Sequence, residues 1–223
     1  MTVGLVIVSH SARLAEGVAE LAGQMAPDVP IEAAGGLPDG GLGTDYQRVT
    51  DALTAAEQGA GAVLLYDLGS ARMTAELAVE AAEEPERFAV AEAPLVEGAV
   101  AAAVAAAGGA DLAGVLAAAT GAGADGDAEP EVAAPAPDDQ RIELVLDNEV
   151  GLHARPAAIL ARSVAGLDAE VTVRHGTQSA DARSVLALLG LAARKGDTIE
   201  VSAHGPDAAD ALAKVRAAVH DFG

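Results

Sequence analysis

The chain has 223 residues, of which 51% are hydrophobic, and a formal net charge of −21 at pH 7. This length allows one large or two ordinary domains, each with a real core, and we expect two. The charge argues against nucleic acid and anionic membranes as partners, because both require a basic surface. The absence of cysteine excludes disulfides and thiolate metal sites. The apolar residues 3–8 are too few for a membrane span and lack the pattern of a secretory signal, so we expect a soluble, cytoplasmic protein.

Residues 1–120 alternate between strand-like and helical patterns. Short apolar runs predict strands, and between them apolar residues recur at helical spacing, as at Leu14, Val18, Leu21 and Met25. The predicted strands are 3–8, 31–34, 62–66 and 88–91, and two Ala-rich helices at about 95–107 and 111–119 close the region. This alternation predicts an α/β domain with a parallel sheet and helices on both faces.

His10 follows the first of these strands, at the edge where ligands collect in an open parallel sheet. Asp67 follows the third strand and is expected at the same edge, where its carboxylate would fix the histidine tautomer and leave the other ring nitrogen nucleophilic. Ser9 and Ser11 could hydrogen-bond the ring or a phosphate, and Ser70 could stabilise the phosphate or cap the next helix. A histidine simply satisfied at a loop remains the alternative.

Residues 121–139 combine glycine, proline and acid with almost nothing to bury, which predicts a flexible linker. The charge also changes there. Residues 1–120 hold 4 basic and 17 acidic residues, whereas 140–223 hold 9 basic and 11 acidic. The order after the linker is strand, helix, strand, strand, helix, strand and helix, with the second helix predicted at 184–193. This order predicts a smaller α+β open-faced sandwich with helices on one sheet face.

Residues 151–156 read Gly-Leu-His-Ala-Arg-Pro and have the local chemistry of a histidine that carries a phosphoryl group. Imidazole is largely unprotonated near neutral pH, so His153 can attack phosphorus. If His153 caps the helix that begins at Ala154, the free N–H groups of the first turn would bind phosphate. Arg155 can add a two-pronged contact to the phosphoryl oxygens. A helix start with a bystander histidine is the alternative reading.

The remaining histidines and the glycine pairs give little evidence of further functional sites. His175, His204 and His220 have no partner carboxylate at a metal-ligand spacing, so we interpret them as surface residues, and no metal is expected. The glycine pairs at 35–36 and 40–41 lack the lysine of a phosphate-binding loop and the dinucleotide fingerprint, so we expect them to shape turns around the first site.

Residues 140–223 resemble the histidine-containing phosphocarrier HPr of the phosphoenolpyruvate-dependent phosphotransferase system. The similarity rests on residues 151–157 and on 182–191, the second-helix region. The resemblance implies that His153 accepts phosphate from enzyme I on its δ nitrogen, with assistance from Arg155. Ser184 falls at the regulatory serine of that family, but it also suits a plain helix N-cap.

Residues 1–120 resemble the phosphotransferase subunits of dihydroxyacetone kinase, which are relatives of the mannose-family enzyme IIA domains. The matching segments are 6–14, 34–36, 43–45, 67–71 and 93–98, and the last favours the dihydroxyacetone branch over the sugar-transport branch. This resemblance implies that His10 carries phosphate on its ε nitrogen, that Asp67 lies within reach, and that the domain forms a homodimer.

Together the resemblances imply a phosphoryl relay without cofactor or metal. Enzyme I would phosphorylate His153, His153 would phosphorylate His10, and His10 would pass the group to ADP on the nucleotide-binding subunit of dihydroxyacetone kinase, whose other subunit binds dihydroxyacetone. Two alternatives stay open. One is a mannose-type IIA–HPr fusion that feeds a sugar permease, and the other is a regulatory phosphoprotein without onward transfer.

Overall fold

The computed structural model describes residues 1–122 and 140–222. The chain divides into two compact units, Met1–Gly126 and Asp127–Gly223, and each is considered by itself below. Most of the predicted linker, from residue 123 to residue 139, lies outside the described residues.

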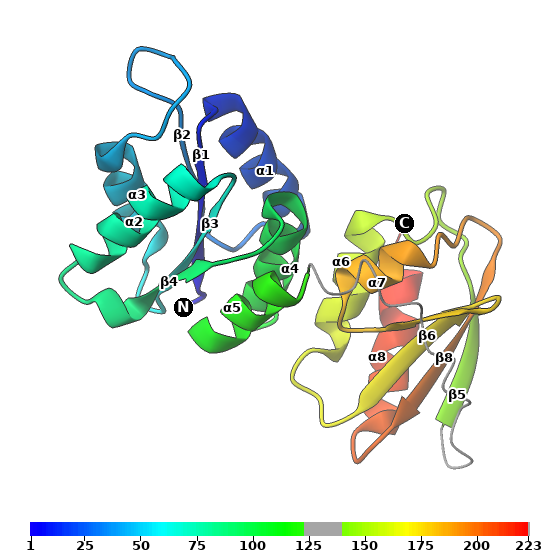
Figure 1. Ribbon diagram of the computed structural model, residues 1–223. Helices are drawn as coiled ribbons and strands as arrows, with labels where there is room; N and C mark the ends of the chain where they lie inside the picture. Colours follow the sequence, from blue (N-terminus) through cyan, green and yellow to red (C-terminus); the bar gives the residue numbers. More distant parts are fainter. Residues whose placement is uncertain (123–139, 223) are drawn as a thin grey trace. The chain divides into compact units, whose positions relative to one another are not determined.

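The first unit is a parallel four-stranded sheet between two layers of helices (Figure 1). Its elements are β1 (Gly4–Ser9), α1 (Ala12–Met25), β2 (Ile31–Gly35), α2 (Tyr46–Ala56), β3 (Ala62–Tyr66), α3 (Gly69–Glu80), a 3-10 turn (Pro85–Arg87), β4 (Phe88–Ala91), α4 (Leu95–Ala107) and α5 (Leu112–Gly121). The strand order is β2-β1-β3-β4, with every neighbouring pair parallel. Both the parallel sheet and the helices on both faces are as predicted.

The central strand β1 is buried on both faces, and it separates two apolar cores. Leu5 and Ile7 pack with α1, α4 and α5 on one face. Val6 and Val8 pack with α2 and α3 on the other. A parallel strand covered on both sides needs a continuous apolar run, which explains why this segment does not alternate with polar residues. The switch in strand order falls between β1 and β3, so the ends of these two strands form the crevice of the sheet.

The buried face of α1 differs from the predicted one. Val18 and Met25 are buried as expected, but Leu14 and Leu21 are 42% and 40% exposed. Ala15 and Ala22 take the core positions instead. The small alanines bring the helix close to the sheet, so the stripe that faces the core is shifted from the one that the larger residues suggested.

Glu57 ties the end of α2 to the start of β3. Its carboxylate accepts hydrogen bonds from the amides of Gly59 and Gly61 and pairs with Arg87 at 2.7 Å. The Gly61 amide, opposed by desolvation but helped by the Gly59 amide and by Arg87, holds the pKa of Glu57 below its ordinary value. The ionised carboxylate therefore stabilises this connection.

The second unit is an antiparallel sheet covered by helices on one face (Figure 1). Its elements are β5 (Gln140–Val145), α6 (Ala154–Val164), β6 (Glu170–His175), β7 (Gln178–Asp181), α7 (Val185–Gly190), β8 (Thr198–His204) and α8 (Ala208–His220). The strand order is β5-β8-β6-β7. Along β6 and β8, buried residues such as Val171, Val173, Ile199 and Val201 alternate with more exposed ones, which confirms the predicted open-faced sandwich.

Helix α7 is shorter than the predicted helix 184–193. It ends at Gly190, and Ala192 has a left-handed backbone with φ of 48°. The residues that leave the helix instead form a connection to β8. We call residues 191–197 the support segment.

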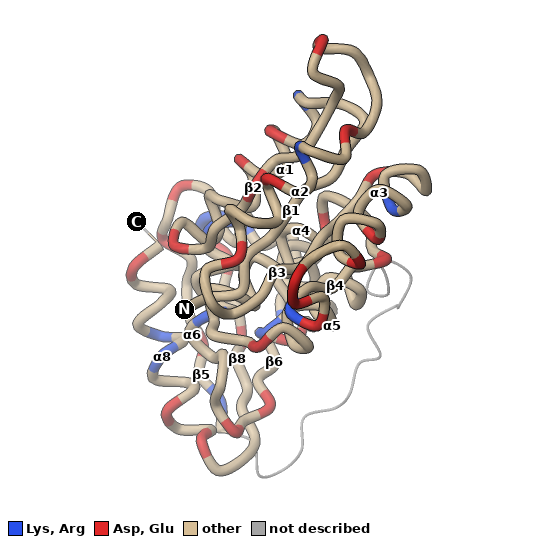
Figure 2. Tube along the Cα trace, turned by 90° about the vertical axis from the view of Figure 1, so that its left-hand side faces the viewer, with Lys and Arg blue, Asp and Glu red and all other residues tan. Residues whose placement is uncertain are grey.

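Charge is distributed unevenly between the units. Figure 2 shows acidic positions along most elements of the first unit, with few basic positions among them. Among the described residues, no helix combines the length and hydropathy that a membrane crossing requires.

Candidate active sites

His10 and Asp67 meet at the carboxyl edge of the first sheet, one after β1 and one after β3. The ring Nδ1 of His10 lies 2.9 Å from Oδ1 of Asp67, and the His10 amide donates to Oδ2 at 2.9 Å. An ionised carboxylate only accepts hydrogen bonds, so Nδ1 carries the proton. The Nε2 atom is therefore the nitrogen with the free electron pair. The predicted juxtaposition of these two residues is present.

The Ser9 hydroxyl forms a hydrogen bond with Asp67. Its side chain is fully buried, its hydroxyl donates to Oδ2 of Asp67 at 2.8 Å, and it accepts from the Ser11 amide at 3.0 Å. The Ser11 hydroxyl accepts from the Leu14 amide and is the N-cap of α1. Neither hydroxyl contacts the His10 ring in this structure, and the binding of a phosphate by these serines stays a prediction. Both hydroxyls are engaged in local structure.

Ser70 is the serine that contacts the ring. Its Oγ lies 2.7 Å from Nε2 of His10. The expectation that Ser70 caps α3 is wrong, because the N-cap is Leu68 and Ser70 is the second residue of the helix. Its side chain is thus free to face the histidine. Helix α3 begins at Gly69, and the first amides of a helix have no acceptor within it, so the amides of Gly69 and Ser70 can face an anion at this end.

Asp67 is held ionised. Partial burial raises its pKa, but the His10 amide, the His10 ring and the Ser9 hydroxyl together lower the pKa below the ordinary value. The Leu68 amide adds a further donor to Oδ1 at 2.7 Å. A carboxylate that stays charged can stabilise the positive charge that the imidazole gains when Nε2 forms a new bond.

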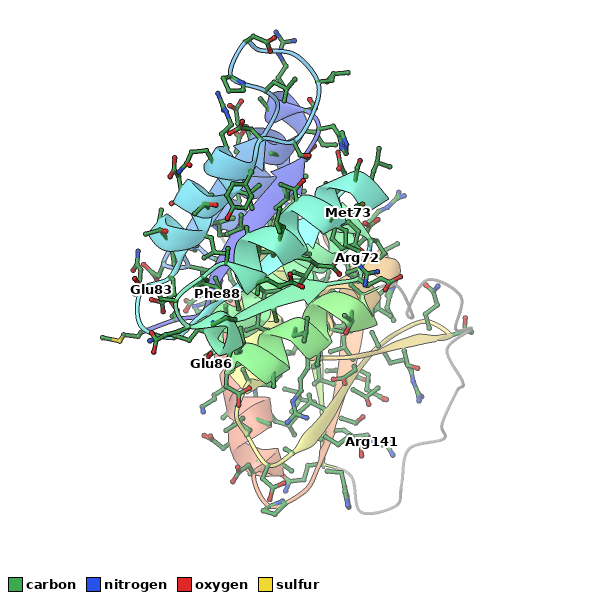
Figure 3. All side chains as sticks on the ribbon, turned by 60° about the vertical axis from the view of Figure 1, so that its left-hand side comes forward. Arg72, Met73, Glu83, Glu86, Phe88 and Arg141 are labelled. Atoms are coloured by element: carbon green, nitrogen blue, oxygen red, sulfur yellow. The ribbon has the colours of Figure 1, made fainter. Side chains whose placement is uncertain are left out.

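The loop after β2 contacts His10, and three exposed apolar residues lie close in sequence to residues of the site: Leu42 precedes Gly43, Leu68 follows Asp67, and Met73 lies three residues after Ser70. The Gly43 amide donates to the His10 carbonyl at 2.9 Å, which fastens the loop after β2 to the site. Leu42, Leu68 and Met73 are 77%, 62% and 71% exposed. Met73 projects from the end of α3 where the helix begins, next to Arg72 (Figure 3). We call these three residues the apolar rim.

His153 lies at the N-cap of α6, as predicted, and its residue is exposed. Its side chain makes no capping hydrogen bond. The ring therefore stands at the end of the helix where amides and dipole favour a phosphate. Arg155 is exposed on the first turn, while Pro156 is buried beneath it. The two sites differ, because in the part of the chain that the structure describes no carboxylate is in ion-pair contact with the His153 ring.

The loop before His153 is fixed by backbone contacts to the support segment. We call residues 146–152 the carrier loop. The Leu152 amide donates to the Ala193 carbonyl at 2.9 Å, and the Leu146 amide donates to the Asp197 carbonyl at 2.9 Å. Gly151 has φ of 65°, and a Cβ there would lie 2.4 Å from the Ala193 oxygen. Only glycine fits this turn without displacing the support segment.

Two family models match the chain. The model EIIA-man, described as the PTS system fructose IIA component, matches residues 4–116, and PTS-HPr, described as the PTS HPr component phosphorylation site, matches residues 140–221. The PTS-dependent dihydroxyacetone kinase phosphotransferase subunit DhaM of Lactococcus lactis is 38% identical over 99 residues, which cover 44% of this chain and 78% of that protein. The chain belongs to the DhaM family.

The DhaM relatives that match nearly the whole chain are longer than it is. The phosphoryl donor subunit DhaM of the PEP-dependent dihydroxyacetone kinase of Pantoea ananatis is 36% identical over 239 residues, covering 99% of this chain and 50% of that protein. The Escherichia coli subunit of the same name is 35% identical over 236 residues, again with 50% of its length covered. The chain spans about half the length of these curated relatives.

Ser184 of this DhaM-family chain lies at the start of α7. The hydroxyl of Ser184 accepts from the Ala187 amide at 3.2 Å as the N-cap of α7, so the capping interpretation describes its geometry. Within residues 1–122 and 140–222, no group of three or more His, Asp or Glu side chains is arranged to hold a metal ion.

Sequence reasoning missed two features of this DhaM-family chain. The role of Ser9 as a donor to Asp67 had no signal beyond its burial at the end of a strand. His175 was interpreted as a surface residue, but its side chain is 28% exposed and contacts the Leu191 carbonyl and Asp197. Nothing in the spacing of these residues along the sequence brings them together.

Proposed function

We propose that the chain is the phosphoryl-relay subunit of a dihydroxyacetone kinase that draws its phosphate from phosphoenolpyruvate. His153 accepts the phosphoryl group from enzyme I and passes it to His10. His10 then passes it to ADP on the nucleotide-binding kinase subunit, and the ATP formed there phosphorylates dihydroxyacetone. The names of the relatives, which describe them as phosphoryl donor subunits, support this assignment.

The observation that carries the proposal is the arrangement of His10 between Asp67 and Ser70. Asp67 fixes the proton on Nδ1, and the pair of electrons on Nε2 points to the Ser70 hydroxyl at 2.7 Å. The hydroxyl donates to Nε2 before transfer. When phosphorus approaches, the same hydroxyl turns away from the electron pair and donates to a phosphoryl oxygen.

The transfer between the histidines is a displacement at phosphorus. The bond from phosphorus to His153 breaks as the bond to Nε2 of His10 forms, and the His153 nitrogen recovers its electron pair. The phosphorylated His10 ring keeps the proton on Nδ1 and becomes cationic, and the ionised Asp67 stabilises that charge. The onward step reverses this at ADP, where a phosphate oxygen takes the group and the ring returns to its neutral form. No electron is gained or lost overall.

At His153 the donors are backbone groups and Arg155. The first-turn amides of α6, beginning at Ala154, and the helix dipole attract the three oxygens of the phosphoryl group. Arg155 supplies a cation with a forked set of donors. Such a site binds phosphate without a metal and leaves the group exposed for the next acceptor.

The apolar rim supports a docking role for the first unit. Leu42, Leu68 and Met73 are exposed and lie close in sequence to residues that contact His10, and their unit is acidic. A partner with an apolar centre and basic residues at its edge fits this surface, because complementary charge steers the encounter. The kinase subunit that holds ADP has to present such a surface for direct transfer.

A homodimer formed through the first unit belongs to the same proposal. Strand β4 lies at the edge of the sheet, with Phe88 partly exposed at its start (Figure 3). An edge strand can pair with a second chain. The cytoplasm is the expected compartment, since phosphoenolpyruvate and ADP are its metabolites.

The test uses two single variants with enzyme I and labelled phosphoenolpyruvate. His153→Ala is expected to take up no label. His10→Ala is expected to take up label but not to form dihydroxyacetone phosphate when the kinase subunits and ADP are added. Transfer instead to a sugar-permease membrane preparation, or full dihydroxyacetone phosphorylation by His10→Ala, would contradict the proposal.

A further inference from the structure

A third histidine spans the support segment that holds the carrier loop. His175 is the last residue of β6. Its Nδ1 lies 2.9 Å from the Leu191 carbonyl oxygen, and its Nε2 lies 3.2 Å from Oδ2 of Asp197. The ring therefore connects the first residue of the support segment with the last.

Both acceptors facing the His175 ring require a proton on the ring. A neutral imidazole has one N–H group and the imidazolium has two. The carbonyl of Leu191 and the carboxylate of Asp197 can only accept, so the imidazolium is the form that satisfies both contacts. Oδ2 of Asp197 also accepts from the Arg194 amide at 2.8 Å.

Two other charged groups on these elements have ion-pair partners of their own. Arg174, which precedes His175 on β6, lies 3.8 Å from Glu200 of β8. Lys195 of the support segment lies 3.9 Å from Glu149 of the carrier loop. The His175 ring of β6 contacts both ends of the support segment, at Leu191 and at Asp197.

The backbone of the support segment includes one residue in a disfavoured conformation, which surrounding contacts must stabilise. Ala192 has φ of 48°, a left-handed conformation that a side chain with Cβ disfavours. Among the described residues other than glycine, it alone has a positive φ. A strained residue persists only where its surroundings fix it, and His175 fixes the residue just before it.

The support segment transmits this hold to His153. The Ala193 carbonyl accepts from the Leu152 amide at 2.9 Å, directly before His153. At the other end, the Asp197 carbonyl accepts from the Leu146 amide at 2.9 Å, and the Gly196 amide donates to the Leu146 carbonyl at 2.7 Å. A shift of the support segment would therefore move the carrier loop and the N-terminus of α6 with it.

We propose that His175 and Asp197 are positioning residues for phosphoryl transfer at His153. The contacts of His175 with Leu191 and Asp197 hold the support segment, so that the Ala193 carbonyl keeps the carrier loop and the His153 ring aligned with the amides of α6. Neither residue touches the transferred group. The proposal rests on the proposed role of His153 as acceptor, and its tests separate the two.

The kinetic test uses the full chain carrying His10→Ala, so that the phosphoryl group stops at His153. Initial labelling rates are measured with phosphoenolpyruvate over a range of enzyme I concentrations. Adding His175→Ala is expected to lower kcat by about 10- to 100-fold with KM little changed, because a misplaced acceptor slows transfer without altering the docking surface. His175→Gln, which keeps one donor, is expected to recover part of the rate. His204→Gln, at the far end of β8 opposite Glu170, is the matched control and is expected to change nothing.

Hydrogen exchange gives a readout that does not need activity or the more disruptive variant. In His175→Gln, the amides of Leu146, Leu152 and Gly196 are expected to exchange faster, while those of the β6–β8 pairing keep their rates. A uniform rise across the second unit would mean general destabilisation and would overturn the proposal. Combining His175→Ala with Asp197→Ala is expected to cost no more than the larger single effect, because the two residues act as one unit.

The outcomes distinguish the two proposals. If the parent takes up no label at His153, the proposed function fails, and the exchange data alone decide the role of His175 and Asp197. If the parent is labelled but His175→Ala retains its kcat and the Leu152 amide keeps its exchange rate, the positioning role is wrong and the proposed function stands.

Discussion

The two histidine sites of this chain surround the imidazole with different kinds of groups, although the same chemistry is proposed for both. At His10 the neighbours are side chains, since Asp67 holds one ring nitrogen and Ser70 faces the other. At His153 the neighbours are backbone groups at a helix N-terminus, and the ring makes no capping hydrogen bond. The first arrangement selects the tautomer and the attacking nitrogen. The second leaves the ring open and depends on the position of the carrier loop.

This difference suits the order of the proposed relay. An exposed ring on a helix end can meet more than one partner, so His153 is suited to accept from enzyme I and to give to His10. A ring fixed by a carboxylate is suited to a single direction of approach. The comparison predicts that the rate of transfer is most sensitive to polar side chains at the first site. At the second site it is most sensitive to substitutions that change the backbone conformation.

The largest effect is expected at Asp67. In Asp67→Asn the ring loses its charged acceptor and the fixed tautomer, so transfer from His153 to His10 is expected to fall by about 1,000- to 10,000-fold. Labelling of His153 by enzyme I stays unchanged. The measurement is single-turnover transfer followed by mass spectrometry of both histidines. Asp28→Asn, in the exposed turn after α1, is the control. An equal loss of transfer rate in Asp67→Asn and Asp28→Asn would contradict the role assigned to the Asp67 side chain.

The matching change at the second site is Gly151→Ala. The added Cβ would lie 2.4 Å from the Ala193 oxygen at a φ of 65°. We expect the free energy of unfolding of the second unit to fall by about 2–4 kcal/mol, and labelling of His153 to fall by about 100-fold. Calorimetry and initial rates measure the two effects.

Gly166→Ala is the control for that variant. Gly166 also has a positive φ, of 75°, but no heavy atom lies within 4 Å of its added Cβ. It is expected to lose only about 1 kcal/mol from backbone strain and to keep its labelling rate. A labelling defect as large as that of Gly151→Ala would mean that strain in the unit, and not the carrier loop, limits the reaction.

The two serines near His10 give a smaller effect. Ser70→Ala removes the hydroxyl that faces Nε2, and the rate of His10 phosphorylation is expected to fall by about 10- to 100-fold. Ser11→Ala removes the N-cap of α1 and is expected to cost about 1 kcal/mol of stability without changing the rate. Rapid-quench kinetics and urea unfolding measure both. A slower phosphorylation of His10 in Ser11→Ala, with an unchanged rate in Ser70→Ala, would instead favour Ser11 as the phosphate ligand.

The smallest effect concerns the stability of the first unit. The lowered pKa of Glu57 means that its carboxylate stabilises the fold above the ordinary pKa, and this contribution is lost as the pH falls through the lowered value. Glu57→Gln is expected to cost about 1–2 kcal/mol at pH 7, with the difference vanishing at acid pH. Urea unfolding across this pH range measures it.

Glu83→Gln is the control for Glu57. Glu83 projects from the connection between α3 and β4 (Figure 3) and is exposed. Its substitution is expected to change the free energy of unfolding by less than about 0.5 kcal/mol at any pH. A pH-independent loss in Glu57→Gln would show that packing, and not the charge, stabilises the connection.

Much of the fold and the pairing of His10 with Asp67 could be predicted from the sequence. Periodicity gives the strands, and the rule that parallel strands end at one edge brings residues 57 positions apart together. The face of α1 could not be predicted, because apolarity alone ranks Leu14 and Leu21 above the alanines that pack against the sheet. Packing distance decides that choice, and it is a property of the assembled unit.

The contacts of individual polar side chains also could not be predicted from the sequence. Whether Ser70 caps α3 or faces His10 depends on where the helix begins, and a shift of two residues exchanges the two roles. The early end of α7 has a similar consequence. It creates the support segment that His175 contacts, and no pattern along the sequence announces that the helix stops at Gly190.

The most direct test of the relay is a time course of the phosphoryl group on the wild-type chain. Enzyme I and phosphoenolpyruvate start the reaction, alkali stops it, and mass spectrometry with phosphorus NMR identifies the modified residue and nitrogen. The account predicts that phosphate appears first on Nδ1 of His153 and then on Nε2 of His10, with the first signal feeding the second. Phosphate on His10 without prior modification of His153, or on Nδ1 of His10, would contradict it.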